Sequence, residues 1–549
     1  MHYEEALALS RRDDRTLASA FLEQVKRAPN VAAVTDLEGS LSRIQLAGAA
    51  MALWSPLEIA DQEERVGVLL PPGRGGALVN VALAVNGRTA VNLNHTAGAA
   101  ALRRMCELAE VRTVVTARAY TDRIGWPEGL PVRRLDLEDV RPRVSKAQAV
   151  WHMMRIRMRS PRALVKGGPD DIACIVFSAG STGDPKGVQL SHRQVLANVR
   201  GILEHLDLQR DDDTLLCPLP LFHSFGVSTG LWMPLTAGVK LAAHPDPTDA
   251  RGIGELSKVT APSFFASTPT FVRAYLRRIE PETWSTLRFG VVGAEKCPAD
   301  LRREFTRRYG CELLEGYGCT ELAPVVSVNR VDSLTPPGVP ASRDGTAGTP
   351  LPGVAVLTMD PDTKEILPRG EPGLLVVRSP ARMTGYLGRP DLTEAAFVHG
   401  GYNTGDMGFV DDEGFVHITG RLARFAKIGG EMIPMDLVED RLLEELAHVA
   451  GEDHEHDLAV AAVPHRSKGE QLVILHTPMP TSLDDLVSRL DDLPRIFRPR
   501  ATNAFEVEAI PTLGTGKRDL KGLQDLALAL ARPADRTRGT PASIQAGPS

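Results

Sequence analysis

Ten residues from Ser178 to Gly187 combine glycines, hydroxyl side chains and a lysine in a pattern suited to holding phosphate. Glycine lets backbone N–H groups approach a ligand closely, hydroxyls add hydrogen-bond donors, and the lysine adds positive charge. The candidate phosphate-binding residues are Ser178, Ser181, Thr182, Gly183 and Lys186. The segment is not a Walker A loop, because Gly187 stands where that loop has Ser or Thr. A nucleotide ligand is therefore predicted, with a plain surface turn as the alternative.

Other residues of reactive type follow further along the chain. Glu321 offers the oxygen ligands that hard cations such as Mg²⁺ prefer, and Asp406 lies in a predicted turn where it could accept hydroxyl protons. Lys517 ends a glycine-rich run that could deliver an ammonium group to an anion, and His223 lies between aromatic residues. Taken singly, each has a plainer interpretation as a solvated charge, an Asx turn or a hydrogen-bonded core histidine.

The elements that must position these residues follow from the pattern of apolar runs. Strands are predicted at Val66–Leu70, Thr113–Thr116 and Ile172–Phe177, and a helix over Gly98–Ala109. Such alternation is typical of β-α-β units around a largely parallel sheet. The strand at Ile172–Phe177 leads directly into the phosphate-binding segment, so a buried strand is expected to hold that segment in place.

Composition also indicates more than one domain. A chain of 549 residues is too long for one ordinary core. We predict an α/β fold with a large N-terminal domain of sheets and helices, and a smaller, mobile α+β C-terminal domain. The predicted boundaries are an N-terminal domain at 1–420, a hinge at 421–424, a C-terminal lid at 425–532 and a disordered tail at 533–549.

Five segments, in this order, resemble the signature motifs of the adenylate-forming (AMP-binding) superfamily. That superfamily includes acyl-CoA synthetases, peptide-synthetase adenylation domains and firefly luciferases. The segments are Ser178–Gly187 (phosphate loop), Glu315–Glu321 (adenine and Mg²⁺ motif), Tyr402–Asp406 (ribose motif), Gly420–Arg421 with Lys427–Glu431 (hinge and beyond) and Pro511–Lys517 (catalytic lysine loop). One such motif alone is weak evidence, whereas five in sequence are strong evidence.

Within that superfamily the chain most resembles the acyl-acyl-carrier-protein synthetase module of 2-acylglycerophosphoethanolamine acyltransferase. This resemblance rests on Pro218–Gly226, Gly293–Lys296, Arg424–Lys427 and Leu93–Gly98. It implies a fatty acid substrate that ATP activates to acyl-AMP, with Mg²⁺, and an acyl carrier protein whose phosphopantetheine thiol receives the acyl group. A fatty acyl-CoA ligase is the alternative, because CoA presents the same thiol.

The resemblance also assigns roles to individual residues. The implied catalytic residues are Lys517, Glu321, Thr182 and His223, with Glu321 also the implied Mg²⁺ ligand. The implied ATP-binding residues are Ser178, Ser181, Thr182, Gly183, Lys186, Gly293, Ala294, Glu295, Tyr317, Gly318, Thr320, Asp406 and Arg421. Two positions depart from the family pattern: Ala423 replaces the usual Asp or Lys of the hinge, and Ala179 replaces a common Ser. A non-catalytic nucleotide or acyl-adenylate sensor therefore stays a third hypothesis.

Charge and cysteine content exclude other classes. The net charge of -6 gives no overall attraction to nucleic acid, so no nucleic-acid partner is expected. The six cysteines are scattered without the spacing of a zinc site and are expected to be reduced thiols. The sequence contains no apolar stretch of the roughly 20 residues that span a bilayer, so a cytoplasmic protein is expected.

The segment 141–168 is unusual because it holds eight Arg and Lys residues and no acidic one. If it is helical, its apolar residues at Ala147, Val150, Trp151, Met154 and Met158 share one face. We expect this face to pack on the domain. Contact with an anionic membrane surface or an acidic carrier protein is the alternative.

Overall fold

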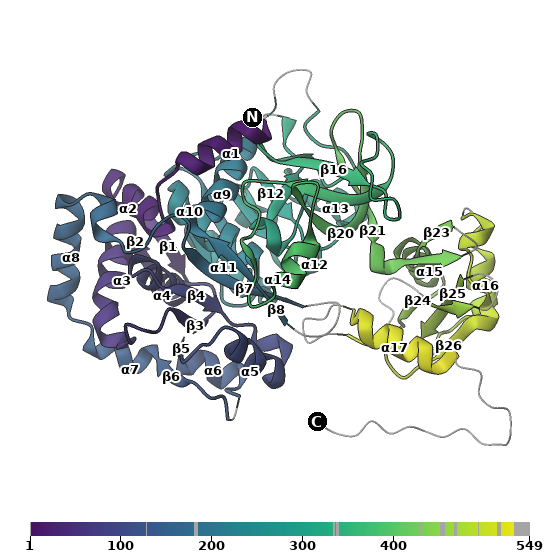
Figure 1. Cartoon of the computed structure of the whole chain (residues 1–549), viewed down its shortest axis with the longest axis horizontal. Coiled ribbons are helices and arrows are strands. Elements are labelled where there is room, and N and C mark those ends of the chain that lie inside the picture. The colour runs from purple at the N-terminus through teal and green to yellow at the C-terminus, as the bar shows by residue number, and fades with distance from the viewer. Residues whose placement is uncertain are drawn as a thin grey trace. The chain divides into compact units, whose positions relative to one another are not determined.

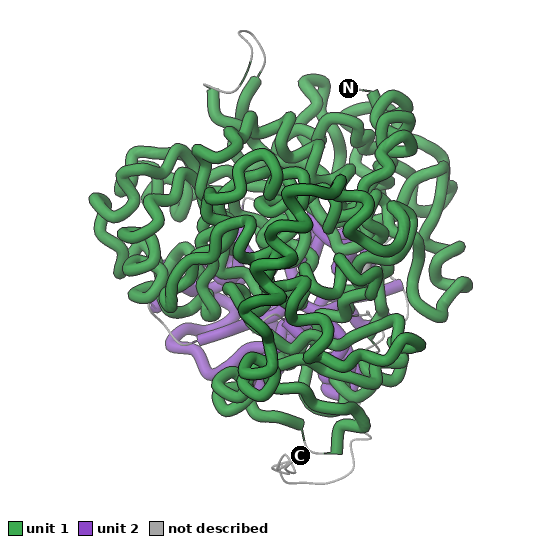
Figure 2. Tube along the Cα trace, turned by 90° about the vertical axis from the view of Figure 1, so that its left-hand side faces the viewer, with its two compact units in different colours: residues 1–418 green, residues 419–549 purple. Residues whose placement is uncertain are grey.

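The computed structural model describes residues 2–127, 129–179, 185–332, 335, 340–428, 431–450, 456–465, 469–491, 493–512 and 518–531. The chain divides into two compact units, residues 1–418 and 419–549 (Figure 2). The predicted α/β class, with a larger N-terminal and a smaller C-terminal part, is confirmed.

The first large sheet of unit 1 has nine strands. Its order is β15 (Thr349–Pro350), β14 (Val325–Val328), β13 (Glu312–Gly318), β12 (Phe289–Val292), β11 (Phe264–Ser267), β9 (Thr214–Cys217), β10 (Lys240–Ala243), β1 (Ala32–Asp36) and β2 (Gly39–Ser42). The strands from β13 to β1 run parallel, and antiparallel strands close both edges. Buried apolar runs such as Phe264–Ser267 are typical of a sheet covered on both faces.

The second large sheet has seven strands. Its order is β18 (Gly385–Tyr386), β8 (Pro185–Ser191), β7 (Ile172–Ala179), β4 (Thr89–Asn92), β3 (Arg65–Leu69), β5 (Thr113–Thr116) and β6 (Arg133–Asp136). The strands from β7 to β6 are parallel, whereas β8 and β18 are antiparallel to their neighbours. The predicted strands at Val66–Leu70, Thr113–Thr116 and Ile172–Phe177 are thus confirmed, with ends shifted by a residue or two.

Helices cover both sheets (Figure 1). The main apolar core joins strands of both sheets to α2 (Leu17–Arg27), α3 (Arg43–Leu57), α4 (Arg74–Val85), α9 (His192–Leu206) and α10 (Met233–Ala237). A separate core packs α11 (Ala250–Thr260), α12 (Pro269–Arg278) and α13 (Ala299–Tyr309) on the nine-stranded sheet. A third packs α5 (Ala99–Leu108), the helix predicted at Gly98–Ala109, on the seven-stranded sheet. The remaining helices of unit 1 are α1 (Tyr3–Arg12), α6 (Arg118–Ile124), α7 (Leu137–Val140), α8 (Lys146–Met158) and α14 (Pro390–Ala396).

A smaller sheet completes unit 1. It is built from β16 (Ala355–Met359), β17 (Gly373–Arg378), β20 (Gly401–Val410) and β19 (Phe397–Val398), with β21 (Val416–Arg421) paired to β20. The strand-rich sequence from Thr346 to Gly420 predicts this region. Asp406, which the sequence places in a turn, lies instead within β20.

The described residues of unit 2 form one sheet with helices on both faces. The sheet contains β23 (Glu431–Pro434), β22 (Phe425–Ile428), β25 (Gly469–His476) and β24 (Leu458–His465), with β26 (Ala504–Glu506) paired to β25. One core contains α15 (Met435–Ala450) and α16 (Leu483–Ser488), and the other contains α17 (Leu520–Ala531). The guanidinium of Arg424 is buried and donates hydrogen bonds to Asp436, Glu439 and the carbonyl of Val460.

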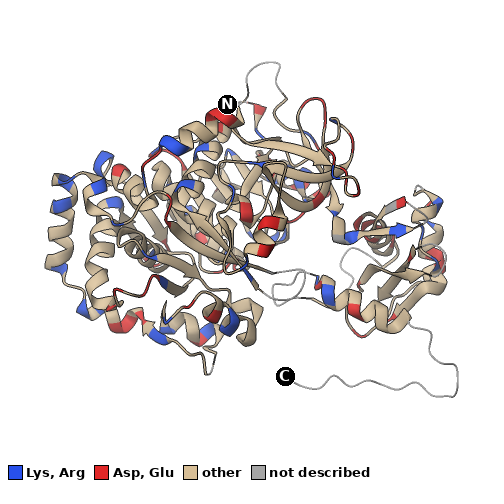
Figure 3. Ribbon diagram, in the orientation of Figure 1, with Lys and Arg blue, Asp and Glu red and all other residues tan. Residues whose placement is uncertain are grey.

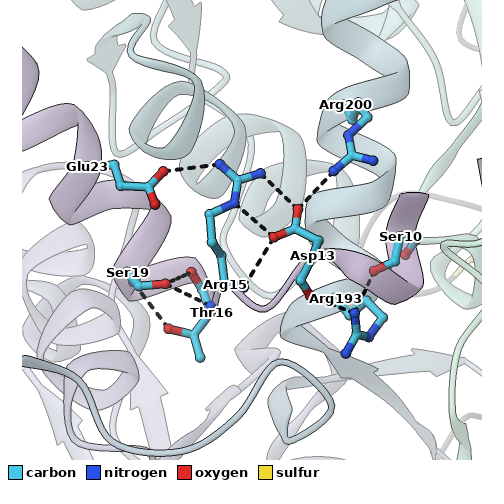
Figure 4. Close-up of polar contacts among 8 residues, drawn as sticks. All are labelled: Ser10, Asp13, Arg15, Thr16, Ser19, Glu23, Arg193 and Arg200. Atoms are coloured by element: carbon cyan, nitrogen blue, oxygen red, sulfur yellow. Dashed lines mark hydrogen bonds and ion pairs between the residues drawn. The ribbon is translucent and has the colours of Figure 1, made fainter. Parts of the chain in front are cut away.

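The segment between α1 and α2 is fixed by an ion cluster (Figure 4). The carboxylate of Asp13 accepts hydrogen bonds from Arg15 at 2.8 Å and from Arg200 of α9 at 2.9 Å. Arg193, also of α9, donates to the carbonyls of Ser10 and Asp13. Because these contacts join positions about 180 residues apart, they hold the N-terminal segment on the body of unit 1.

Helix α8 packs on α3 by a face that the sequence does not predict. Ile156 is its one fully buried residue, and a Cβ on Gly48 of α3 would lie 2.7 Å from Met153. Trp151 and Met158, which we expected to pack on the domain, are exposed. The helix carries apolar residues on two faces, so periodicity alone does not select the buried one. Within the described residues, no helix is long and apolar enough to cross a membrane.

Candidate active site

The hairpin formed by β7 and β8 carries the ends of the predicted phosphate-binding segment. Ser178 and Lys186 are direct partners in its antiparallel register. The residues between the strands, 180–184, include Ser181, Thr182 and Gly183 and lie outside the described part of the chain. The loop proper is therefore shorter than the ten-residue motif, because its first and last residues are paired strand residues.

The position of Gly187 differs from the one expected from the sequence. The sequence treats it as a loop glycine, but it lies in β8 opposite Phe177. A Cβ at this position would come within 3.2 Å of Leu387 and 3.2 Å of Phe177. The glycine thus favours close packing of these side chains, and it does not have a left-handed backbone.

Glu321 is held by a tyrosine from a distant strand. The hydroxyl of Tyr386 donates a hydrogen bond of 2.9 Å to Oε1 of Glu321 and lies 3.1 Å from the hydroxyl of Tyr402. Glu321 and Tyr386 are each 8% exposed, and Tyr402 is 6% exposed. Burial, reinforced by the charge of Glu321, raises the pKa of Tyr386 above its usual range, so this hydroxyl stays protonated and donates.

Lys186 connects this carboxylate to the hairpin. Its ammonium lies over the ring of Tyr386, 5.6 Å from the centroid. The two residues approach because β18, which contains Tyr386, pairs with β8, which contains Lys186. One tyrosine side chain thereby has a positive charge over its ring and a carboxylate at its hydroxyl.

A second acid–tyrosine pair lies beside the first. The hydroxyl of Tyr317 in β13 donates a short hydrogen bond to Oδ2 of Asp406 in β20. Asp406 is 6% exposed, and its own N–H donates to the hydroxyl of Thr404 at 3.1 Å. Burial, followed by the charge of Asp406, raises the pKa of Tyr317 well above its usual range. Tyr317 and Glu321 are four residues apart, so one segment carries a member of each pair.

The segment between Tyr317 and Glu321 is tightly constrained. A Cβ on Gly318 would lie 2.1 Å from the carbonyl oxygen of Pro324, so no larger residue fits. The hydroxyl of Thr320 lies 3.1 Å from that of Ser224. Ser224 comes directly before the π-helix Phe225–Trp232, so this hydrogen bond joins the two segments.

The Gly293–Glu295 segment follows β12, the neighbour of β13 in the sheet. Ala294 has a φ of 68°, a left-handed conformation that is uncommon for alanine. The carboxylate of Glu295 accepts a hydrogen bond of 2.6 Å from the hydroxyl of Thr270. A Cβ on Gly293 would lie 3.2 Å from the carbonyl oxygen of Gly316, so the segment lies close against β13.

His223 is exposed, which excludes the interpretation of a buried core histidine. Its ring lies 4.6 Å from that of Phe222, and Phe222 in turn contacts His95 at 5.3 Å. Burial, then the charge of Arg123, lowers the pKa of His95. The three rings form a small aromatic cluster at the start of the Phe225–Trp232 π-helix.

Two predicted site residues belong to unit 2. Arg421 is exposed at the end of β21. Lys517 lies outside the described residues, as do 513–516. Neither residue is therefore placed relative to the acid–tyrosine pairs of unit 1.

Sequence reasoning did not select Tyr386, Tyr402 or Ser224 as functional residues. Tyr402 lies in the segment that resembles the ribose motif, and Ser224 lies in the Pro218–Gly226 segment. Their places in these segments could have indicated a functional role for both residues. The sequence contains no such indication for Tyr386, because this residue lies outside every recognised motif. Its partner is 65 residues away and is found only in the folded chain.

The AMP-binding enzyme family matches residues 21–387. Among curated relatives, 4-coumarate-CoA ligase 2 of Narcissus pseudonarcissus is 31% identical over 64% of this chain and 61% of its own length. The long-chain-fatty-acid–CoA ligase of Bacillus subtilis (strain 168) is 30% identical over 55% of this chain and 51% of its own length. The matched part thus spans about half to three fifths of these two relatives.

Solved structures of other proteins have the same fold as this chain. ATP-bound MatB from Rhodopseudomonas palustris is 23% identical, with a TM-score of 0.75 over 94% of this chain and 100% of that one. A Mycobacterium tuberculosis fatty acyl CoA synthetase is 22% identical, with a TM-score of 0.70 over 94% of this chain and 99% of that one. Because the family match covers more than half of its residues, the chain belongs to the AMP-binding enzyme family.

Proposed function

We propose that this protein activates a fatty acid with ATP and transfers the acyl group to a phosphopantetheine thiol. In the first step a carboxylate oxygen of the acid attacks the α-phosphorus of ATP, and the bond from that phosphorus to pyrophosphate breaks. In the second step the thiol attacks the acyl carbon and AMP leaves. The observation that carries this proposal is the pair of buried acid–tyrosine contacts, Glu321 with Tyr386 and Asp406 with Tyr317, in a member of the AMP-binding enzyme family.

The proposed phosphate contacts come from the β7–β8 hairpin and from the segment that follows β13. They comprise Ser178, Ser181, Thr182, Gly183, Lys186 and Thr320. The attack concentrates negative charge, so the hairpin acts by positioning and neutralising the phosphates. Lys186 is suited to this because its ammonium already lies beside the Glu321–Tyr386 pair.

Asp406 is the proposed ribose ligand. Its Oδ2 accepts from Tyr317, which fixes the orientation of the carboxylate. A carboxylate accepts several hydrogen bonds, so it can also accept from ribose hydroxyls. Tyr317 and Gly318 are proposed to lie against adenine, with Gly293, Ala294 and Glu295 at the edge of the base. Arg421 is proposed to contact ribose or phosphate.

Glu321 is the proposed Mg²⁺ ligand, and its chemistry fits that ion. Mg²⁺ is commonly held by one or two carboxylates together with phosphate oxygens and waters. Within the described residues no group of three or more His, Cys, Asp or Glu could hold a metal alone, so one carboxylate plus ATP is the fitting arrangement. When bound, Mg²⁺ would neutralise phosphate charge. The protein's own part is the hydroxyl of Tyr386, which orients Glu321.

Lys517 and His223 complete the proposed catalytic set. Lys517 is proposed to bring its ammonium to the α-phosphate and the carboxylate in the first step, and then to withdraw as unit 2 rotates about residues 421–424. His223 is proposed to lie near the carboxylate of the acid, which its exposure permits.

Two thiol acceptors are considered. Acyl carrier protein is favoured by the resemblance of the Pro218–Gly226 segment to an acyl-carrier-protein synthetase module. CoA is favoured by the curated relatives, whose names describe CoA ligases. Both acceptors use the same thiol chemistry, so the first step does not depend on which is correct.

The deciding experiment is carboxylate-dependent ATP/pyrophosphate exchange with fatty acids of graded length, followed by addition of CoA or a holo carrier protein. We expect exchange with a restricted range of acids and thioester formation with one acceptor. ATP binding without exchange for any acid would contradict the proposal and favour a nucleotide or acyl-adenylate sensor.

A further inference from the structure

Helix α8 is held on unit 1 by one face only. Ile156 is buried, and Ala149 and Met153 approach Gly48 of α3 so closely that a Cβ there would lie 2.9 Å from the carbonyl of Ala149. Ser145 caps the start of the helix by accepting from the N–H of Gln148. The helix is therefore well formed and anchored without any contribution from its opposite face.

The opposite face exposes large apolar side chains. Val150 is 49% exposed, Trp151 53%, Met154 50% and Met158 76%. Val150, Met154 and Met158 are four residues apart and Trp151 lies beside them, so all four form one strip along the helix. No other helix within the described residues exposes four such side chains. Scattered single apolar residues need no explanation, but a continuous strip does.

Basic residues border this strip on both sides. Arg157 is seven residues from Val150 and Arg155 is four from Trp151, so they lie on opposite edges of the strip. The guanidinium of Arg155 stacks over the Trp151 ring at 4.5 Å, and Lys146 and Arg157 are exposed. Figure 3 shows α8 with basic positions and no acidic one. This local positive charge contrasts with the net charge of -6 for the whole chain.

We propose that α8 is a docking surface for an anionic phospholipid bilayer. In this arrangement the helix lies in the plane of the membrane, with Trp151, Met154 and Met158 entering the boundary between headgroups and acyl chains. Lys146 and Arg157 meet the phosphates of the headgroups. An apolar strip with basic borders, with tryptophan in the strip, is the composition that such interfacial helices share. Each basic residue near an anionic surface adds about 1 kcal/mol of attraction.

Charge complementarity favours this occupant over parts of the same protein. The segment 532–549 contains three arginines and one acidic residue, so it carries the same sign as α8. A second copy packed on α8 by two-fold symmetry would place the basic borders against each other. An acidic protein would satisfy the charges, but exposed Trp and Met side chains beside a basic rim are better satisfied by lipid.

The test uses the full chain and two kinds of vesicle, pure phosphatidylcholine and phosphatidylcholine mixed with phosphatidylglycerol. We expect co-sedimentation with the mixed vesicles, weakened by added salt. The variant Trp151→Gln/Met154→Gln/Met158→Gln and the variant Lys146→Glu/Arg157→Glu should each bind at least about tenfold more weakly. Matched controls are Val259→Gln on α11, which is 78% exposed, and Arg303→Glu/Arg307→Glu on α13.

A spectroscopic measurement tests the depth of insertion directly. Mixed vesicles containing brominated lipid should quench part of the tryptophan fluorescence, and Trp151→Phe should abolish that part. The proposal is overturned if wild-type protein does not bind mixed vesicles, or if the α8 variants bind them unchanged. In the latter case, a raised KM for carrier protein with Lys146→Glu/Arg157→Glu would assign the face to that partner, and loss of self-association with the glutamine variant would assign it to a second copy.

Discussion

The hydroxyl of Tyr386 donates a hydrogen bond of 2.9 Å to Oε1 of Glu321, although 65 residues separate the two along the chain. Both side chains are buried, and Lys186 lies over the tyrosine ring. A single residue outside every recognised motif thus connects the proposed metal-binding acid to the proposed phosphate-binding hairpin.

Replacing Tyr386 by Phe removes the hydroxyl and leaves the ring. We expect roughly a tenfold loss of ATP/pyrophosphate exchange, with a higher Mg²⁺ requirement, because the partner that orients Glu321 is lost. Tyr309→Phe is the matched control, since its hydroxyl donates to the backbone carbonyls of Tyr275 and Ile279, away from the acid–tyrosine pairs. Equal activity of the Tyr386→Phe and Tyr309→Phe variants would contradict a positioning role.

Replacing Asp406 by Asn should raise the KM for ATP by roughly 10- to 100-fold, because hydrogen bonds to a charged group are stronger than those to a neutral one. Tyr317→Phe should raise that KM by a smaller factor, because it keeps both the ring and the carboxylate. Steady-state exchange kinetics measure both effects. Asp300→Asn, on α13, serves as the control. A changed KM for the fatty acid with an unchanged KM for ATP would contradict the ribose assignment.

Replacing Lys517 by Ala should lower adenylate formation by at least about 100-fold, because the proposed charge on the α-phosphate is removed. Thioester formation from preformed acyl-AMP should remain near the wild-type rate. The two half-reactions are measured separately, with Lys521→Ala as the control on α17. Equal loss of both half-reactions would show that Lys517 is not specific to the first.

Glu315, at the centre of β13, should make stability depend on pH. Burial raises the pKa of this carboxyl to about 7, against its usual 4.5. The folded state therefore binds the proton more tightly, and the free energy of unfolding should fall as the pH rises from about 4.5 to about 7. Glu315→Gln should remove this dependence and be more stable than wild type at pH 8, by about 3 kcal/mol.

Urea unfolding of Glu315→Gln at acidic and alkaline pH measures that difference. The substituted amide keeps an oxygen for the N–H of Cys297, which donates to Glu315 at 3.2 Å in the wild type. Glu304→Gln, at an exposed position on α13, is the control and should be neutral. A constant difference between Glu315→Gln and wild type across this pH range would mean that the carboxyl does not titrate there.

Asp13 should have the opposite pH dependence. Burial disfavours its charged form, but the hydrogen bonds and charge of Arg15 and the charge of Arg200 outweigh this and lower its pKa below 3.8. Its contribution to stability is therefore complete above about pH 4 and is lost as the pH falls through the lowered value. Asp13→Asn should destabilise unit 1 by about 1–2 kcal/mol at neutral pH.

The destabilisation by Asp13→Asn should shrink in acid, where wild-type Asp13 becomes protonated. Thermal unfolding at neutral and acidic pH measures this, with the exposed neighbour Asp14→Asn as the control. A destabilisation that is equally large in acid would show that the effect arises from packing rather than from charge.

The local sequence by itself determined many of the strands and helices of this protein. The alternation of apolar runs and amphipathic stretches predicted strands such as Ile172–Phe177 and helices such as Gly98–Ala109, because burial imposes a period on each element. The resemblance of five ordered segments to the adenylate-forming superfamily singled out Glu321 and Asp406, although each acid taken alone has a plainer interpretation.

Tertiary structure decided what periodicity could not. Apolar residues on two faces of α8 satisfy the same helical pattern, and only contact with Gly48 of α3 selects Ile156 rather than Trp151 for burial. Likewise the partners of Glu321 and Asp406 come from other strands, and Gly187 is a strand residue because Phe177 lies opposite it. The local sequence pattern indicates which side chains are apolar enough to be buried and which are charged. Which of them meet depends on long-range strand pairing and helix packing, whose energies belong to pairs of distant residues.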